Sequence, residues 1–318
     1  MKLSIIIPHY GDWQLLRRCL ESYAATAAGP DVECVVVDNA SPDAAAGDAL
    51  CRAYPRTRLL RQEENTGFGR ACNCGAAAAA GEWLLVLNND TVLEPGWLAA
   101  FADGSARWPE TAAFAALMLY PERATIENAG LLLARTGLVY ANRRGELVTN
   151  AADGEEIFAP CGGGMFIRRD VFLTMGGFDE RYFAYSEDAE LGWRLQRAGR
   201  RTRVLTGVRI RHWHGSTART LPAFARARMI TENRLRTWLL HWPAGMILRN
   251  AGWLLLAESA LLLQTLLRER TLGGAAGWLT VLRNMPAWRR EYRRQAAAVQ
   301  QFQPERWLCR HWRPERYR

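Results

Sequence analysis

Lysine is almost absent from this chain. Lys2 is the only one among 318 residues, so arginine accounts for the other 40 of the 41 cationic Lys and Arg side chains. A P-loop and a catalytic Schiff base both need a suitably placed lysine. The sequence therefore argues against both of these classes of site.

Paired cysteines are also missing. The seven cysteines are odd in number and form no Cys-x-x-Cys motif, which indicates reduced thiols in a cytosolic protein rather than a disulfide framework. Cys72 and Cys74 could ligate a metal, but no second pair completes a zinc site of the usual spacing.

Long apolar runs are absent as well. The first run, residues 3–7, is too short for a secretory core, and Pro8 ends it as it would a buried strand. The best later stretch, residues 251–267, carries Glu258 and Gln264 and is shorter than the roughly 20 apolar residues of a membrane span. It predicts a buried or interfacial helix.

The net charge of +9 is unevenly distributed. Residues 219–318 hold 18 arginines against 6 acidic residues, a balance of +12, so residues 1–218 sum to −3. Tryptophan and arginine on apolar helices suit an anionic membrane interface. A helical appendage packed on the rest of the chain, or on a second copy of it, is the alternative. No recognised nucleic-acid module is present, so we expect no nucleic acid as a partner.

The order of apolar segments predicts an open, mostly parallel α/β sheet flanked by helices. Helices are expected after the N-cap residue Asp12, over 70–80, over 95–108 and from Ser186. Strands are expected at 4–7, 32–37, 58–61, 83–87, 112–119 and 204–205, with a hairpin or irregular insertion over 124–150. The domain prediction is a catalytic domain over 1–218, with halves of about 1–110 and 111–218, followed by a helical region over 219–318.

Asn88-Asn89-Asp90 follows the apolar run 83–87, which is typical of a buried parallel strand. Ligands of α/β folds bind at the carboxyl ends of such strands. A carboxylate flanked by amides suits a hard divalent cation and the phosphates it carries. The alternative is an ordinary Asn-Asn-Asp turn.

Two other segments have the chemistry of a nucleotide site. Asp38 ends the second expected strand, where a carboxylate can accept hydrogen bonds from a base or ribose, or can simply form an Asp-Asn turn. The segment Asn65-Thr66-Gly67-Phe68-Gly69-Arg70 opens the alanine-rich helix with free backbone N–H groups that suit an anion. It is not the Gly-x-Gly-x-x-Gly fingerprint, and glycine turns before helices are common.

Glu187 and Asp188 lie in the first turn of an expected helix. They can compensate the helix dipole, or one can act as a general base that takes a proton from a hydroxyl. His212 and His214 flank Trp213, and either could complete a metal site with Asp90. Two ordinary histidines of a surface loop are the alternative.

Taken together and in this order, the motifs resemble a family-2 glycosyltransferase of the GT-A (Rossmann-like) fold, in its rhamnosyltransferase-like branch. The matching blocks are SIIIPHY (4–10), CVVVDNAS (34–41), NTGFGRACNCG (65–75), WLLVLNNDTVLEPGWL (83–98), GGGMFIRRDVF (162–172), GGFDERYFAYSEDAELGWRLQRAG (176–199), HWHGS (212–216) and ENRLR (232–236). They cover about two thirds of the chain, and the ordered set is more specific than any single block.

The resemblance implies roles for individual residues. Asp188 would be the catalytic base, with Glu187 beside it. Asp90 would bind Mg²⁺ or Mn²⁺, with His212 as the late metal ligand and His214 as the second choice. The nucleotide sugar would contact Pro8, Tyr10, Asp38, Asn65, Gly67, Arg70, Asn88, Asn89 and Asp90.

The chain departs from the family pattern at two positions. Gly11 stands where the family often has Asn, and Asn88 replaces the first acid of the Asp-x-Asp metal motif. One carboxylate then remains instead of two. We therefore expect a metal site that depends on His212, on water and on the donor's own phosphates.

The function that the resemblance implies is inverting, metal-dependent transfer of a sugar from a nucleotide-diphosphate donor to a hydroxyl of a glycan or lipid-linked acceptor. The process would be cell-surface polysaccharide assembly, in the cytoplasm and at the inner face of the membrane. A dTDP-linked deoxysugar such as rhamnose is the favoured donor by resemblance only. The alternatives are a nucleotidyltransferase or dinucleotide-binding protein, and a non-catalytic sugar-nucleotide-binding or scaffold protein of the same fold.

Overall fold

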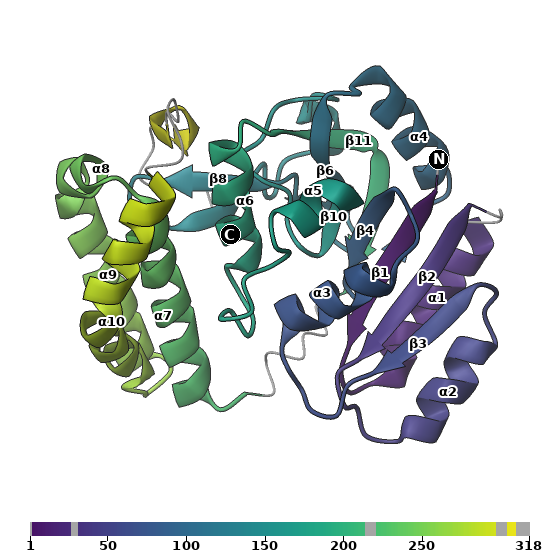
Figure 1. Ribbon diagram of the computed structural model, residues 1–318, viewed down its shortest axis with the longest axis horizontal. Coiled ribbons are helices and arrows are strands. Elements are labelled where there is room, and N and C mark those ends of the chain that lie inside the picture. The colour runs from purple at the N-terminus through teal and green to yellow at the C-terminus, as the bar shows by residue number, and fades with distance from the viewer. Residues whose placement is uncertain (1, 27–30, 214–220, 297–303, 310–318) are drawn as a thin grey trace.

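The computed structural model describes residues 2–26, 31–213, 221–296 and 304–309. Its centre is one nine-stranded sheet with the strand order β3-β2-β1-β4-β10-β6-β11-β5 and with β7 paired to β6 (Figure 1). The prediction of an α/β sheet flanked by helices is confirmed.

The first half of the sheet is parallel, as predicted. It consists of β1 (Leu3–His9), β2 (Val32–Asp38), β3 (Thr57–Arg61) and β4 (Trp83–Leu87). Every residue of β4 is buried, because helices cover both faces of such a sheet. The carboxyl ends of these strands therefore deliver Asp38 and Asn88 to one edge.

The second half of the sheet is mixed. Two antiparallel pairings place β10 (Gly164–Arg168) between β4 and β6 (Thr111–Leu119). The predicted strand at 204–205 is in fact part of the twelve-residue β11 (Arg201–His212), whose register sets His212 opposite Thr91 of β5 (Thr91–Leu93). The short β7 (Ile126–Asn128) lies at the edge of this half.

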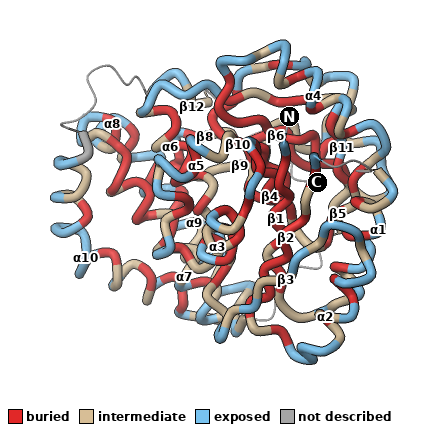
Figure 2. The backbone as a smooth tube through the Cα atoms, turned by 45° about the vertical axis from the view of Figure 1, so that its right-hand side comes forward, coloured by how far each residue is buried: buried red, intermediate tan, exposed pale blue. Residues whose placement is uncertain are grey.

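Helices pack on both faces of the sheet, and alternate strand residues bury toward each face. Ile5 and Ile7 join one core with α1 (Trp13–Thr26), α2 (Ala44–Arg52) and α4 (Trp97–Arg107). Ile6 joins the opposite core with α3 (Phe68–Ala78), α5 (Arg169–Thr174) and α6 (Glu187–Arg197). Figure 2 shows this buried centre.

The C-terminal helices lie side by side at one end of the molecule (Figure 1). They are α7 (Ala223–His241), α8 (Ala244–Arg249), α9 (Ala251–Leu267) and α10 (Gly273–Ala296). A third core joins them to Trp193 of α6 and to the hairpin of β8 (Leu131–Ala134) and β9 (Val139–Ala141). The expected boundary near residue 218 stays a prediction.

Smaller elements complete the fold. They are the 3-10 helices Val148–Asn150 and Pro304–Trp307 and the strand β12 (Leu308–Cys309), which pairs with β8. Within the described ranges, no helix is long and apolar enough to cross a membrane. All seven cysteines are free, as the sequence predicts.

Candidate active site

The turn that follows β4 meets the end of β11 at the sheet edge. His212 Nε2 lies 3.1 Å from Asp90 Oδ1 and 3.4 Å from Asn88 Nδ2. The backbone N–H of Trp213 donates to the carbonyl of Asp90 at 2.9 Å. Asp90 and His212, which are 122 positions apart, are thus brought together by the β5–β11 pairing.

Glu127 of β7 holds the other side of the His212 ring. Both of its carboxylate oxygens lie 3.0 Å from Nδ1. Burial alone would lower the pKa of His212, but the hydrogen bonds and charges of Asp90 and Glu127 outweigh it and raise that pKa to about 9. A carboxylate on Nδ1 fixes the ring orientation and directs Nε2 toward Asp90.

Asp90 and His212 are the two side chains suited to ligate a divalent cation here. Among the residues described, no group of three or more His, Cys, Asp or Glu side chains could hold a metal ion. A carboxylate oxygen and an imidazole nitrogen fit Mn²⁺ or Mg²⁺ when water and phosphate oxygens supply the remaining ligands. The donor set therefore fits a cation that is shared with a diphosphate.

Glu187 and Asp188 open α6 after a strained turn. Tyr185 and Ser186 both have positive φ, 68° and 71°, an uncommon conformation that clusters at functional sites. Glu187 is 7 % exposed, and its Oε2 makes no hydrogen bond to a described residue. Burial, followed by the charge of Asp188, raises the pKa of Glu187 to about 8.

Asp188 is half-buried and lies against a glycine segment. Its Oδ2 accepts a hydrogen bond from the N–H of Gly162 at 3.0 Å, and burial raises the pKa of its carboxyl. On the same segment, the carbonyl of Gly163 accepts from the N–H of Asn88 at 3.2 Å. A Cβ at Gly163 would lie 2.9 Å from Asn88 Nδ2. Glycine therefore allows the turn 88–90 and the pair Glu187 and Asp188 to approach the backbone of this segment from its two sides.

The expected nucleotide segments also meet. Asn39, which follows Asp38 at the end of β2, donates from Nδ2 to the carbonyl of Gly67 at 3.0 Å and accepts from Thr66. Asn65 Oδ1 accepts from the N–H of Gly67. Asp38 itself accepts from the N–H of Ser41 at 2.8 Å, and Arg61 lies 3.2 Å from its other oxygen. The Asp-Asn turn and the helix start therefore form one unit.

The remaining nucleotide-site predictions lie around this unit. Asn89 Nδ2 is 2.7 Å from Nδ1 of His9, which is next to Pro8 and Tyr10 at the end of β1. Arg70 is exposed, with Glu180 at 3.7 Å. Nucleotide binding by these residues stays a prediction.

A comparison with known protein families shows to which family this chain belongs. The family model described as "Glycosyl transferase family 2" matches residues 4–176. The chain belongs to glycosyl transferase family 2. This confirms the expectation of a glycosyltransferase at the level of the family.

Two relatives of this family-2 glycosyltransferase support the expected branch. The N-acetylglucosaminyl-diphospho-decaprenol L-rhamnosyltransferase of Mycobacterium tuberculosis is 32% identical over 62% of this chain and 71% of its own length. The O-antigen biosynthesis protein RfbC of Myxococcus xanthus is 32% identical over 75% of this chain. The match spans only 19% of RfbC.

Solved structures confirm the GT-A fold of this family-2 glycosyltransferase. GalNAc-T7 with UDP, GalNAc and Mn²⁺ is 17% identical with a TM-score of 0.61, over 77% of this chain and 48% of that chain. The mannosyltransferase PcManGT of Pyrobaculum calidifontis, in complex with GDP-Man and Mn²⁺, is 16% identical with a TM-score of 0.56, over 93% of this chain and 85% of that chain.

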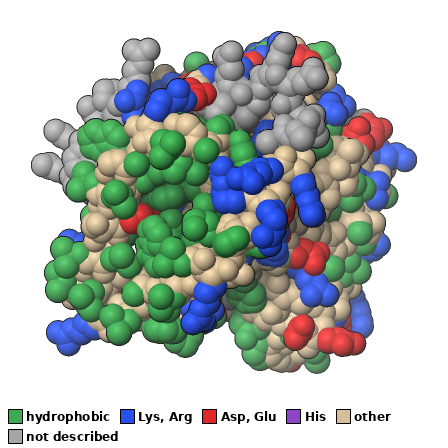
Figure 3. Space-filling model, turned by 60° about the vertical axis from the view of Figure 1, so that its left-hand side comes forward, with side chains coloured by type: hydrophobic (Ala, Val, Ile, Leu, Met, Phe, Trp, Pro, Cys, Tyr) green, Lys and Arg blue, Asp and Glu red, His purple; other side chains and the backbone are tan. Residues whose placement is uncertain are grey.

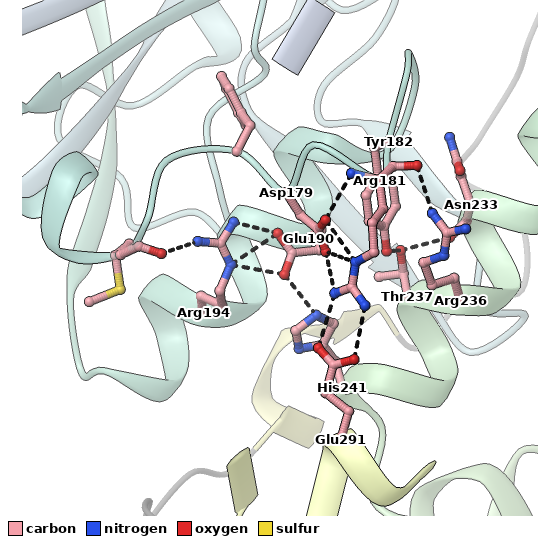
Figure 4. Close-up of polar contacts among 12 residues, drawn as sticks. Asp179, Arg181, Tyr182, Glu190, Arg194, Asn233, Arg236, Thr237, His241 and Glu291 are labelled. Atoms are coloured by element: carbon pink, nitrogen blue, oxygen red, sulfur yellow. Dashed lines mark hydrogen bonds and ion pairs between the residues drawn. The ribbon is translucent and has the colours of Figure 1, made fainter. Parts of the chain in front are cut away.

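A polar network ties α6 of this family-2 glycosyltransferase, which carries Glu187 and Asp188, to its C-terminal helices (Figure 4). Buried Glu190 of α6 pairs with Arg194 and lies 3.2 Å from His241 of α7. Tyr182 Oη is 2.9 Å from Thr237 of α7. These contacts fix the loop before α6, and hence the position of Glu187 and Asp188.

Three residues of the site were not predicted from the sequence. Glu127 lies in a segment expected to form a hairpin or an irregular insertion, and only the pairing of β7 with β6 places it beside His212. Asn39 was expected only as part of an Asp-Asn turn, and its side chain in fact bonds to Thr66 and Gly67. His9 ends β1, and nothing in the sequence marked it as part of the site. Burial lowers its pKa to about 4.

Gly11 and His214, the two other positions that the sequence analysis singled out, have simple structural outcomes. Gly11 has a φ of +99°, and its N–H donates to Ser41 Oγ at 3.0 Å. His214 lies outside the described residues, so the choice between His212 and His214 as metal ligand is described for His212 alone.

Proposed function

We propose that this chain is an inverting, metal-dependent glycosyltransferase. It would move a sugar from a nucleotide-diphosphate donor to a hydroxyl of a glycan or lipid-linked acceptor in polysaccharide synthesis. The observation that carries the proposal is the segment 161–164, which contacts Asn88 of the metal turn on one side and Asp188 on the other.

Asp90 and His212 would hold the divalent ion, and Glu127 would orient His212. When bound, such an ion supplies charge stabilisation to the leaving diphosphate. Asn65, Gly67 and Arg70 would line the nucleotide side together with Pro8, Tyr10 and Asp38. The backbone N–H groups at the start of α3 favour an anion there.

Asp188 would take the proton of the acceptor hydroxyl. A hydroxyl is a poor nucleophile until a base removes its proton, and a positioned carboxylate typically contributes 10²–10⁴-fold. A single displacement inverts the anomeric carbon, so the base must face the leaving group across the sugar. The raised pKa of Asp188 supports this role, because a more basic carboxylate accepts a proton more readily.

The donor and acceptor classes rest on relatives. The printed name of the mycobacterial relative includes a rhamnosyl donor and a diphospho-decaprenol acceptor. We propose the same classes here, with a dTDP-linked deoxysugar as the first donor to test. Peripheral contact with an anionic membrane would bring the protein to such an acceptor.

The Asp188→Asn substitution tests the base. Transfer, assayed with nucleotide sugars in Mn²⁺ or Mg²⁺, should fall by about 10²–10⁴-fold, while calorimetric donor binding stays near that of the wild type. Transfer at the wild-type rate would show that Asp188 is not the base. Donor binding without turnover by the wild-type protein on any acceptor would favour a non-catalytic sugar-nucleotide-binding protein.

A further inference from the structure

The turn before α6 holds two residues in an uncommon backbone conformation. Tyr185 and Ser186 both have positive φ, although neither is a glycine, and such a conformation persists only when the surrounding structure holds it. Ser186 is the N-cap residue of α6, but its side chain makes no capping hydrogen bond. Other parts of the fold therefore have to restrain this turn.

An asparagine of α7 binds the backbone of the turn. The Nδ2 group of Asn233 donates to the carbonyl of Ala184 at 2.9 Å and to the carbonyl of Tyr185 at 3.0 Å. The Asn233 side chain is 3 % exposed, so water competes little for these two bonds. Both hydrogens of one amide group are thus used on the carbonyls of two consecutive residues.

Two neighbours of Asn233 hold the earlier part of the same loop. Positions 233, 236 and 237 have the spacing of three and four that places side chains on one face of a helix. Arg236 Nη1 donates to the carbonyl of Arg181 at 2.8 Å. Thr237 Oγ1 donates to the carbonyl of Asn233 and lies 2.9 Å from Tyr182 Oη. Figure 4 shows these side chains of α7 beside the loop, which α7 therefore contacts along most of its length.

The loop also touches the start of α3. The carbonyl of Phe183 accepts from the N–H of Phe68 at 2.7 Å. The carbonyls of residues 183, 184 and 185 are thus bound first by α3 and then by Asn233. Asn233 therefore holds the part of the loop that lies nearest to α6 in the sequence.

The restrained turn leads directly to the proposed base. Tyr185, Ser186 and Asp188 line a cavity of about 1090 Å³ beside α7 and α9, and Figure 3 shows hydrophobic side chains around a hollow on the face of the C-terminal helices. Asn233 itself does not line this cavity. It can therefore influence Asp188 through the backbone of the turn without touching a substrate.

We propose that Asn233 is a positioning residue, whose amide holds the turn 184–186 so that the Asp188 carboxylate faces the acceptor hydroxyl. The inference rests on the proposed function, in which Asp188 is the base, and adds to it a residue of the C-terminal helices. The N–H of Gly162 binds Asp188 Oδ2 at 3.0 Å, so a shift of the turn would also pull the carboxylate from this contact. A misplacement of about 1 Å can lower a rate about 10²-fold.

Steady-state kinetics of the full chain test the inference. Asn233→Ala removes both N–H donors, so we expect kcat for transfer to fall about 10–100-fold. The KM for the donor should change less than about twofold, because the expected nucleotide residues lie on other segments. A kcat within twofold of the wild type would overturn the proposal.

Asn250→Ala is the matched control. Asn250 is also buried, and its Nδ2 donates to the carbonyl of Met246 at 2.8 Å where α8 meets α9. This variant loses a comparable buried hydrogen bond but no contact with the loop, so its kcat should equal that of the wild type. Equal losses of kcat in the Asn233 and Asn250 variants would show a general effect of stability and would overturn the proposal.

A glycine in the turn separates positioning from a general structural role. Glycine adopts positive φ at little cost, so Ser186→Gly reduces the need for a restraint. Added to Asn233→Ala, it should raise kcat at least fivefold, whereas it should not raise kcat in the wild type. No recovery would show that the amide does not act through this turn. Asn233→Leu, which keeps about the same volume without an N–H group, gives the same comparison if Asn233→Ala does not fold.

Hydrogen–deuterium exchange follows the turn without any substrate. The backbone amides of 183–189 should exchange at least tenfold faster in Asn233→Ala than in the wild type, and at the wild-type rate in Asn250→Ala. Unchanged exchange in Asn233→Ala would overturn the proposal. Faster exchange in this variant, together with no transfer by the wild-type protein, would support the restraint by Asn233 and count against the proposed function instead.

Discussion

At the scale of single residues, His212 is held between two carboxylates. Asp90 lies at one ring nitrogen and Glu127 at the other, both within 3.1 Å. Asp90 is the acid that the sequence identifies, whereas Glu127 acts only through the histidine. If His212 is a metal ligand, Glu127 determines how firmly its Nε2 is aimed.

The Glu127→Gln substitution should weaken Mn²⁺ binding about tenfold, the lower end of the effect of removing an outer-shell carboxylate. The amide can still accept a hydrogen bond, but it carries no charge. Mn²⁺ titration followed by electron paramagnetic resonance measures the change. Glu122→Gln, at an exposed position five residues earlier, is the matched control, and equal affinities of the two variants would contradict the role of Glu127.

Glu187 makes the stability depend on pH. Its pKa is raised from 4.5 to about 8 in the folded protein, so between these values the folded state keeps a proton that the unfolded state releases. The protonated Glu187 therefore stabilises the folded state at low pH, and this stabilisation is lost as the pH rises toward 8.

The Glu187→Gln substitution removes this titration. Between pH 5 and pH 8 the wild type should lose on the order of 3 kcal/mol of unfolding free energy relative to the variant. Urea unfolding at both pH values measures the difference. A wild type whose stability rises with pH relative to Glu187→Gln would contradict the buried, protonated state.

At the scale of elements, the loop before α3 is shaped by Gly67. Its φ is +86°, and an added Cβ would lie 2.3 Å from the carbonyl oxygen of Phe183. That oxygen accepts from the N–H of Phe68 at 2.7 Å. The glycine thus permits the contact between the expected nucleotide loop and the segment before α6.

The Gly67→Ala substitution should destabilise the protein by about 1–3 kcal/mol, because it combines a strained φ with a backbone clash. Gly96 provides a matched control, since its φ is also +86° but no atom lies within 4 Å of its added Cβ. Gly96→Ala should cost about 1 kcal/mol. Urea unfolding measures the loss of unfolding free energy in both variants. Equal losses would show that the close contact of Gly67 with Phe183 does not affect stability.

The same scale shows what local patterns could predict. The buried run 83–87 and the N-cap Asp12 are where the sequence placed them, because burial and capping depend on near neighbours. The length of β11 was underestimated, since Arg203, Arg209 and Arg211 interrupt its apolar pattern. Their partners, such as Glu94 beside Arg211 at 2.7 Å, are remote in the chain.

At the scale of the whole molecule, the C-terminal helices both support the site and expose apolar side chains, among them Leu255, Leu263 and Leu267 of α9. Arg181, in the loop before α6, pairs with Glu291 of α10 at 2.9 Å. Deleting these helices would therefore remove support for Glu187 and Asp188. Membrane contact is better tested by surface substitutions.

Replacing Leu255, Leu263 and Leu267 together by Gln should reduce co-sedimentation with anionic liposomes more than tenfold, because each leucine buried in lipid contributes about 1.5–3 kcal/mol. The control replaces Leu147 and Leu173, which are exposed outside the C-terminal helices, by Gln. If both variants bind liposomes as the wild type does, these leucines of α9 are not the membrane contact.

The sequence by itself determined the fold class, the family and most of the candidate site residues, because ordered motifs and buried strands are local patterns. Only the tertiary structure decided that His212 lies against Asp90, that Glu127 holds it and that one glycine segment joins Asn88 to Asp188. It also decided that the basic, tryptophan-rich helices share a core with α6, the helix of Glu187 and Asp188. These arrangements depend on strand pairing and helix packing between distant segments, for which the linear pattern of residues carries no signal.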